Sequence, residues 1–295
     1  MPDVEAAGRA ILHRKEHLLR IADGAVPALT GRGGGARELE VRCLEPGMLV
    51  VHVYVDCCDA MGANLVNTVA EALGDVIAEI GGGKRGLRIL TNLCDRRCVR
   101  ILARVPGSAL ATKTLEGDEV IAGVVNASRF AAADPYRAAT HNKGIMNGID
   151  AVCMATGNDW RAVEAGAHAF ASRGGRYKPL ATWRAAVGPD GSNVLEGSLE
   201  LPLAFGVVGG TLRVHPTARL ALALLGSPSA TQLAAVAASA GLASNLAALR
   251  ALATDGIQRG HMTLHSRSVA HGACVNPRDR PEGTTREAVA FGAAT

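Results

Sequence analysis

Aromatic residues are scarce in this chain, whose 295 residues include four Phe, three Tyr and two Trp. A core of normal size must therefore be aliphatic, built mainly from Ala, Val and Leu. Long apolar runs are missing as well. No uncharged stretch reaches about eighteen residues, the length of a membrane-spanning helix, and the N-terminal residues lack the apolar region of a signal peptide. We therefore expect a cytoplasmic protein that does not enter a membrane.

The chain also lacks a strong excess of either charge. Its 31 Lys and Arg residues against 27 Asp and Glu residues give a net charge of +4, without a long basic run. Such a composition argues against a nucleic-acid partner and suits an anionic ligand such as a CoA ester or a dinucleotide.

The cysteines indicate a reducing environment. They are odd in number and lie inside apolar stretches, as reduced cysteines of a cytosolic protein do. They are Cys43, Cys57, Cys58, Cys94, Cys98, Cys153 and Cys274. Cys94 and Cys98 form a C-x-x-x-C pair that no second pair follows, so we expect no metal site.

The length allows one large or two medium domains. Residues 1–106 predict a small ferredoxin-like domain, because helical and extended patterns alternate in the order helix, strand, strand, helix, strand, strand. The expected helices cover 4–22 and 59–80, and the expected strands cover 39–44, 48–55, 87–93 and 99–105. A Glu-Pro-Gly turn at 45–47 joins the first two strands.

Residues 107–256 predict a larger mixed domain, and residues 257–295 lose the apolar periodicity and form a tail. In the larger domain we expect a strand at 120–125, glycine turns after Lys143, a helix at 159–172 and Ala-rich helices that break at Gly241. The fold class is thus α/β in the α+β sense. Two G-x-G-x-x-[GA] matches, which begin at Gly31 and Gly81, follow helices instead of strands, so they are not Rossmann loops.

The segment 137–166 places ionisable groups among small residues. Lys143 lies between Asn142 and Gly144, and Asp159 follows a Gly-Asn pair. A buried Lys held by a carboxylate can neutralise an oxyanion, so we expect Lys143 and Asp159 to form a salt bridge. The alternative is a surface turn with a solvated lysine.

Two further segments suit a catalytic site. In DAMGANLVN, which begins at Asp59, free amides at a helix N-terminus can bind phosphate, with Asp59 as the expected N-cap. The alternative is an ordinary capped helix. His261, in a Gly-His-Met setting, can donate a proton at neutral pH, or can be an ordinary histidine at a helix end.

The motifs DAMGANLVNTVAEAL, THNKGIMNG, ATGNDW and IQRGHMTLH occur in an order that resembles class II (bacterial-type) 3-hydroxy-3-methylglutaryl-coenzyme A (HMG-CoA) reductase, from about residue 10 to 267. The resemblance implies a homodimer that interconverts HMG-CoA and mevalonate plus CoA with two NADH or NADPH, bound in the ferredoxin-like domain. It implies catalytic Lys143, Asp159 and His261, cofactor-binding Asp59, Met61, Gly62, Asn64 and Asn92, and substrate-binding Arg137, Thr140 and Asn147.

The chain departs from the family pattern at three places. Val26 and Pro27 stand where reductases that prefer NAD tend to carry an Asp, so the choice between NADH and NADPH stays open. The segment with the family's catalytic Glu has no counterpart here, because Glu5, Glu16 and Glu38 lie in other contexts. The residues after 267 also differ. The alternative function is therefore a non-catalytic remnant that binds CoA or dinucleotide, and we expect slow turnover by this chain alone.

Overall fold

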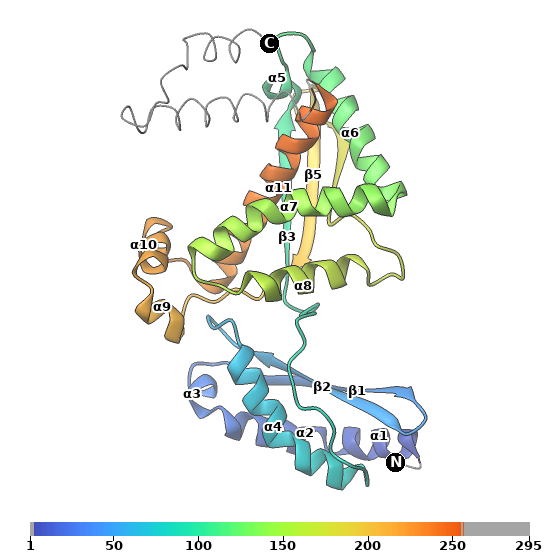
Figure 1. The fold of residues 1–295 in the computed structure, drawn as a ribbon, viewed down its shortest axis with the longest axis vertical. Coiled ribbons are helices and arrows are strands. Elements are labelled where there is room, and N and C mark those ends of the chain that lie inside the picture. The colour runs from blue at the N-terminus through green and yellow to red at the C-terminus, as the bar shows by residue number, and fades with distance from the viewer. Residues whose placement is uncertain (1–2, 255, 257–295) are drawn as a thin grey trace, which may run out of the picture.

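The computed structural model describes residues 3–254 and 256 of the chain. The chain forms two domains, which lie one above the other in Figure 1. The elements of the N-terminal domain are α1 (Val4–His13), α2 (Lys15–Ala25), α3 (Pro27–Thr30), β1 (Gly35–Glu45), β2 (Met48–Asp56) and α4 (Ala63–Ile80). β1 and β2 form the expected antiparallel hairpin, with Val41 opposite Val51. α2 and α4 pack together and bury Leu18, Val69 and Leu73.

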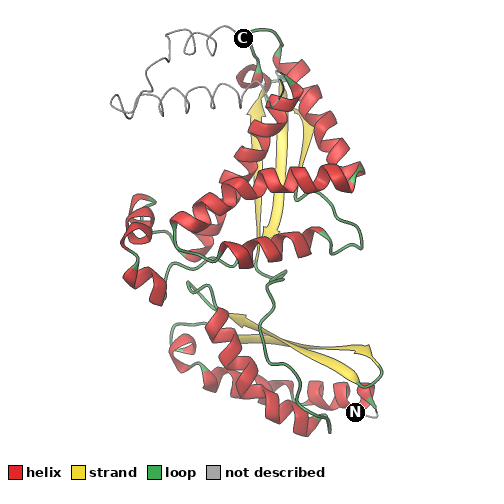
Figure 2. Cartoon of the chain, in the orientation of Figure 1, coloured by secondary structure: helices red, strands yellow, loops and turns green. Residues whose placement is uncertain are grey.

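The second domain contains a three-stranded antiparallel sheet covered by helices (Figure 2). Its strands are β3 (Cys98–Pro106), β4 (Ala181–Val187) and β5 (Asn193–Pro202), in the order β3-β5-β4. Its helices are α5 (Gly107–Leu110), α6 (Gly117–Ala133), α7 (Pro135–Ala155), α8 (Trp160–Ala171), α9 (Gly210–Val214), α10 (Pro216–Leu224) and α11 (Ala230–Ala253). α6, α8 and α11 contact the sheet, and α7 packs across α11.

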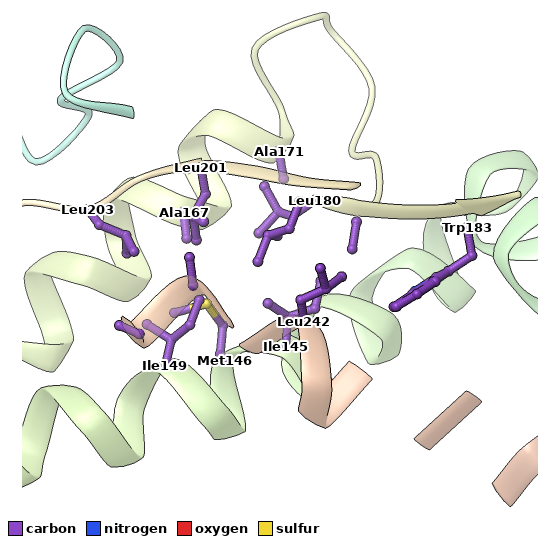
Figure 3. Packing of buried hydrophobic residues seen from close by; sticks show 14 of the residues in the cluster. Ile145, Met146, Ile149, Ala167, Ala171, Leu180, Trp183, Leu201, Leu203 and Leu242 are labelled. Atoms are coloured by element: carbon purple, nitrogen blue, oxygen red, sulfur yellow. The ribbon is translucent and has the colours of Figure 1, made fainter. Parts of the chain in front are cut away.

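The core of the second domain is mostly aliphatic, as the composition predicts. Side chains from α7, α8, α11 and β5 converge there (Figure 3). The buried residues include Ile145, Met146, Ile149, Ala167, Ala171, Leu199, Leu201 and Leu242. α11 is also long and apolar enough to cross a membrane, with a mean hydropathy of 1.4 over its most apolar window. Its contacts with α7, α6 and β3 identify it as a core helix of this domain.

The α+β class is confirmed, but the arrangement of strands differs from the ferredoxin-like order. Residues 87–93 form no strand, and β3 pairs with β5 of the second domain, with Ile101 opposite Leu199. The first sheet therefore has two strands among the described residues. The strand expected at 99–105 in the first sheet therefore belongs to the second sheet, because a short apolar strand does not reveal its partner.

Local predictions fail at three glycine-containing segments. Residues 120–125 lie inside α6 and are not a strand, and α7 and α11 continue through the expected glycine breaks. The run VIAGVV is short and apolar, so its periodicity does not separate a strand from a buried helix. Two of these glycines, Gly148 and Gly241, lie where α7 and α11 contact each other. Without a Cβ atom, each lets the other helix approach closely.

The crossing of α7 and α11 depends on Gly148 and Gly241. A Cβ atom at Gly148 would collide with the carbonyl oxygen of Ala240, and one at Gly241 would lie 2.8 Å from Cγ1 of Ile149. Each helix thus presents a bare backbone to the other. The close contact buries Ile145 and Ile149 between them.

We predict that Gly148→Ala destabilises the protein by about 1–3 kcal/mol, because the added methyl group meets backbone that cannot move aside. Gly144→Ala is the matched control on the same helix, since nothing lies within 4 Å of the added Cβ. That change should be neutral or stabilising by up to about 1 kcal/mol. Urea unfolding of both variants measures the difference, and equal stabilities would contradict the proposed crossing.

α7 and α8 also meet through a pair of carboxyl groups. Burial, together with the adjacent Glu164 carboxyl group on α8, raises the pKa of Asp150 on α7 to about 7. The Asp150 carboxyl group therefore binds a proton more tightly in the folded protein than in the unfolded chain. The stability from this proton is fully present below about pH 4, the unfolded pKa, and is lost as the pH rises through about 7.

Asp150→Asn should therefore reduce the fall in stability between about pH 5 and pH 8. After allowance for solvent screening we expect a reduction of about 1–2 kcal/mol. Melting temperatures of the wild-type protein and the variant across this range measure the effect. Glu71→Gln, an exposed change on α4, is the control. A pH dependence identical in wild type and Asp150→Asn would rule out proton binding by this pair.

Candidate active site

The expected substrate-binding residues share one face of α7. Arg137, Thr140, Lys143 and Asn147 follow one another at intervals of three or four residues, so a helix carries them in a single stripe. Thr140, Lys143 and Asn147 are exposed, and Arg137 is half-buried. Lys143 is therefore a surface residue of this chain and not the buried lysine that the sequence suggested.

Buried polar contacts on the opposite face fix the rotation of α7. The Asn142 amide donates to the carbonyl oxygen of Lys178 at 2.9 Å and accepts from the amide of Leu180 at 2.8 Å. His141 Nε2 lies 3.1 Å from the carbonyl oxygen of Ala181 and 3.2 Å from Nδ2 of Asn245. Burial lowers the pKa of His141 to about 4, so its ring is neutral at pH 7. Because His141 and Asn142, the two preceding residues, are held in the interior, the side chain of Lys143 points outward.

Asp159 ends the turn between α7 and α8 and acts as the N-cap of α8. Its carboxylate accepts from the amides of Arg161 and Ala162 at 3.1 and 3.3 Å. It also lies 3.5 Å from Nε of Arg161, and both side chains are more than a third exposed. An N-cap carboxylate is held in one orientation by the helix that it caps.

The prediction that Lys143 and Asp159 form a salt bridge is wrong within a single chain. Among the described residues, Lys143 has no carboxylate within 4.0 Å and Asp159 pairs with Arg161. At about 1.5 Å of rise per residue, the end of α7 at Ala155 lies roughly 18 Å beyond Lys143. The sequence suggested turns at the glycines after Lys143, whereas a continuous helix separates the two residues.

The N-terminus of α4 offers free amides, but not with the expected cap. The N-cap is Gly62, in the left-handed conformation with φ of 108° and without a side-chain hydrogen bond. The Asp59 carboxylate instead accepts from the amide of Ala230, at the start of α11, at 2.8 Å. The amides of 63–65 have no acceptor among the described residues. A phosphate would therefore meet 63–65, because the Ala60 amide already donates to Cys57.

The two asparagines expected to bind the cofactor, Asn64 and Asn92, lie on different segments. Asn64 is exposed in the first turn of α4, and Asn92 is exposed in the segment that leads to β3. Asn67 holds that segment, since its side chain accepts from the amide of Leu90 at 2.9 Å. Gly166 of α8 lets Asn92 approach, because a Cβ there would lie 2.5 Å from the Asn92 carbonyl oxygen. The sequence motifs did not predict this role of Asn67. Its only signal is that Asn67 follows Asn64 by three residues, on the same side of a helix.

A segment of the second domain, residues 203–208, joins the loop before α4 to the loop before α8. The Asn158 side chain accepts from the Gly206 amide at 2.7 Å and donates to its carbonyl oxygen at 3.1 Å. Gly206 lies against Met61, where a Cβ atom would collide with the Met61 nitrogen. The Val207 amide donates to the Asp59 carbonyl oxygen at 2.9 Å. The loop that contains Asp59 and Met61 is thus brought next to the loop that ends at Asp159.

Other features lie apart from this site. His261 falls outside the described residues. A hollow of about 330 Å³ is lined by Arg173, Lys178 and Glu200 and contains none of the expected site residues. Among residues 3–254 and 256, no cluster of three or more His, Cys, Asp or Glu side chains is arranged to hold a metal ion.

Known proteins resemble the chain over most of its length. The profile of the hydroxymethylglutaryl-coenzyme A reductase family matches residues 1–266. The 3-hydroxy-3-methylglutaryl-coenzyme A reductase of Archaeoglobus fulgidus is 48% identical over 268 residues, which are 90% of this chain and 59% of the relative. A probable reductase of the same name from Borreliella burgdorferi is 38% identical over 255 residues, which are 83% of this chain and 57% of the relative. The chain spans about three fifths of the length of these curated relatives.

A solved structure of a reductase with the same name also matches the chain. The class II 3-hydroxy-3-methylglutaryl-CoA reductase from Streptococcus pneumoniae, bound to NADPH in open conformations, matches with a TM-score of 0.81 and 45% identity. The match covers 85% of this chain and 68% of that one. Sequence and fold therefore agree over both domains, and the chain belongs to the class II HMG-CoA reductase family.

Proposed function

We propose that this protein is an HMG-CoA reductase, which interconverts HMG-CoA and mevalonate plus CoA with two equivalents of NADH or NADPH. The observation that carries the proposal is the contact between the loop before α4 and the loop that holds Asp159, made through Gly206 and Asn158. Family membership supports the same activity. We further propose that the protein acts in the cytoplasm, without a nucleic-acid partner.

The dinucleotide fits the start of α4. Free amides at 63–65 and the positive end of the helix dipole suit a pyrophosphate, and the reductase from S. pneumoniae binds NADPH. Asp59, Met61 and Gly62 shape the loop, and Asn64 and Asn92 provide exposed amides beside it. The bound cofactor would supply one hydride to the thioester carbonyl carbon and a second hydride to mevaldehyde.

The side chains of this protein would manage charge and protons during these steps. Lys143 neutralises the oxyanion that forms when hydride reaches the thioester carbonyl, and Asp159 keeps the ammonium group in place. When the C–S bond breaks, His261 protonates the CoA thiolate. Arg137, Thr140 and Asn147, on the same face of α7 as Lys143, bind the carboxylate end of the HMG group.

A homodimer reconciles these roles with the distance between Lys143 and Asp159. The stripe of α7 that carries Lys143 is exposed in one chain, and Met154 on the same face is 59% exposed. We propose that a second copy covers this face and that Lys143 of one copy meets Asp159 of the other. Each dimer then has two equivalent sites.

We predict that Lys143→Ala lowers kcat by about 10²–10³-fold, because it removes a charge directed at the oxyanion. Purified protein is mixed with HMG-CoA and either NADH or NADPH, and the absorbance of the reduced nicotinamide is followed. Lys113→Ala, an exposed change in the loop before α6, is the control and should retain wild-type turnover. Equal turnover by wild type and Lys143→Ala would contradict the role of Lys143.

We predict that mixing two inactive variants, Lys143→Ala and Asp159→Asn, restores activity. Random reassortment makes about half of the dimers mixed, and each mixed dimer has one site with both groups intact. Turnover should therefore reach about a quarter of the wild-type value. If both groups came from one chain, neither site of a mixed dimer would be intact and the mixture would stay inactive.

The alternative is a protein that binds CoA or dinucleotide without turnover. One observation favours it, because two of the three N-terminal glutamates considered above form ion pairs that do not suit a proton donor. Lys15 lowers the pKa of Glu38, and Glu5 pairs with Arg9 at 3.7 Å. Binding of NADPH or HMG-CoA by the wild-type protein, with no nicotinamide oxidation, would leave this alternative in place of the reductase.

A further inference from the structure

Arg97 lies in the segment that follows α4 and leads to β3, the segment that joins the two domains in Figure 1. It is the residue before β3, and its own carbonyl oxygen accepts from the Leu203 amide at 3.1 Å. Arg97 is half-buried and forms no ion pair within 4.0 Å among the described residues. Its guanidinium group is directed at backbone carbonyl groups instead.

Those carbonyl groups belong to both domains. Nη1 of Arg97 donates to Met61 at 2.9 Å and to Ala60 at 3.2 Å. Nη2 donates to Ala60 at 3.2 Å and to Phe205 at 2.6 Å. A planar guanidinium group holds carbonyl oxygens from two segments in a fixed geometry, whereas the three donors of a lysine ammonium group have no such fork. Arg97 therefore joins the loop before α4 to segment 203–208.

These bonds determine how the loop leads into α4, whose free amides at 63–65 follow directly. In a trans peptide the carbonyl and the following N–H point in opposite directions. With the carbonyl groups of Ala60 and Met61 directed at Arg97, the amides of Met61 and Gly62 point away from it. Gly206 lies against Met61 and is itself bonded to Asn158, the residue before Asp159. The guanidinium group thus controls both the direction of the loop and its distance from Asp159.

We infer that Arg97 is the positioning residue of the dinucleotide site: it orients the loop before α4 and holds it beside Asp159. Among the described residues no carboxylate lies within 4.0 Å of the guanidinium group, so its positive charge also favours an anion bound at the start of α4. This inference rests on the proposed function, in which that helix start binds the pyrophosphate. Arg97 does not contact the reacting atoms and acts through the loop.

We predict that Arg97→Met weakens binding of NADPH and NADH by about 10–100-fold, because it removes several charge-assisted hydrogen bonds from the loop. Equilibrium titrations without the second substrate measure these dissociation constants. The affinity of the variant for free CoA should stay within about twofold of the wild-type affinity. A general loss of structure would weaken CoA binding as well. Arg97→Lys should restore little, since it keeps the charge but not the planar fork.

Arg96→Met is the matched control. Arg96 is the adjacent arginine, but it pairs with Glu40 at 3.2 Å and lies 3.6 Å above the Tyr54 ring, on the β1–β2 hairpin. Its replacement should leave dinucleotide affinity within about twofold of wild type. As a second readout, methylguanidine should recover part of the NADPH affinity of Arg97→Ala and should not change that of Arg96→Ala.

The outcomes separate this inference from the proposed function. If wild-type protein binds neither dinucleotide, the proposed cofactor site fails, and Arg97 has no positioning role there. If wild type binds and Arg97→Met binds equally well, the proposed function stands and the role of Arg97 is overturned. If Arg97→Met does not fold, Arg97→Lys decides the matter. Weaker dinucleotide binding at an unchanged melting temperature supports the inference, and unchanged binding overturns it.

Discussion

The close crossing of α7 and α11 is the constraint on which the arrangement of the second domain depends. Gly148 and Gly241 let two backbones touch, and a methyl group at either position would meet atoms of the other helix. The crossing directs Ile145 and Ile149 of α7 into the core. Lys143 is then necessarily on the outer face. In one chain Lys143 is therefore exposed and separated from Asp159 by the remaining turns of α7.

A second constraint joins the two domains. Segment 203–208 is bonded to Asn158 on one side and touches the loop before α4 on the other, through backbone groups and glycine. Arg97 adds a guanidinium group that reaches carbonyl groups of both domains. Because these contacts use backbone atoms, they depend on the positions of the segments more than on the identities of their side chains. The loop before α4 and the loop before α8 therefore keep a defined distance.

Several features could be predicted from residue patterns because their causes are local. The β1–β2 hairpin follows from alternation around a Glu-Pro-Gly turn, and α8 follows from an Asp cap and helical spacing. The family could be recognised from motifs in order. The prediction that Asp59 caps α4 is wrong. Its carboxylate accepts a hydrogen bond from the Ala230 amide, and this contact joins residues far apart in sequence. Arg97 and Asn158 were missed for the same reason, since their partners are carbonyl and amide groups of distant segments.

The sequence by itself determined the aliphatic core, the α+β class and the family. These depend on composition, short-range periodicity and motifs, which any single segment carries. The tertiary structure decided that β3 joins the second sheet, that α7 runs unbroken through its glycines and that Lys143 and Asp159 are separated. Strand pairing and helix crossing are contacts between segments, whose free energy depends on complementary surfaces that no single segment contains.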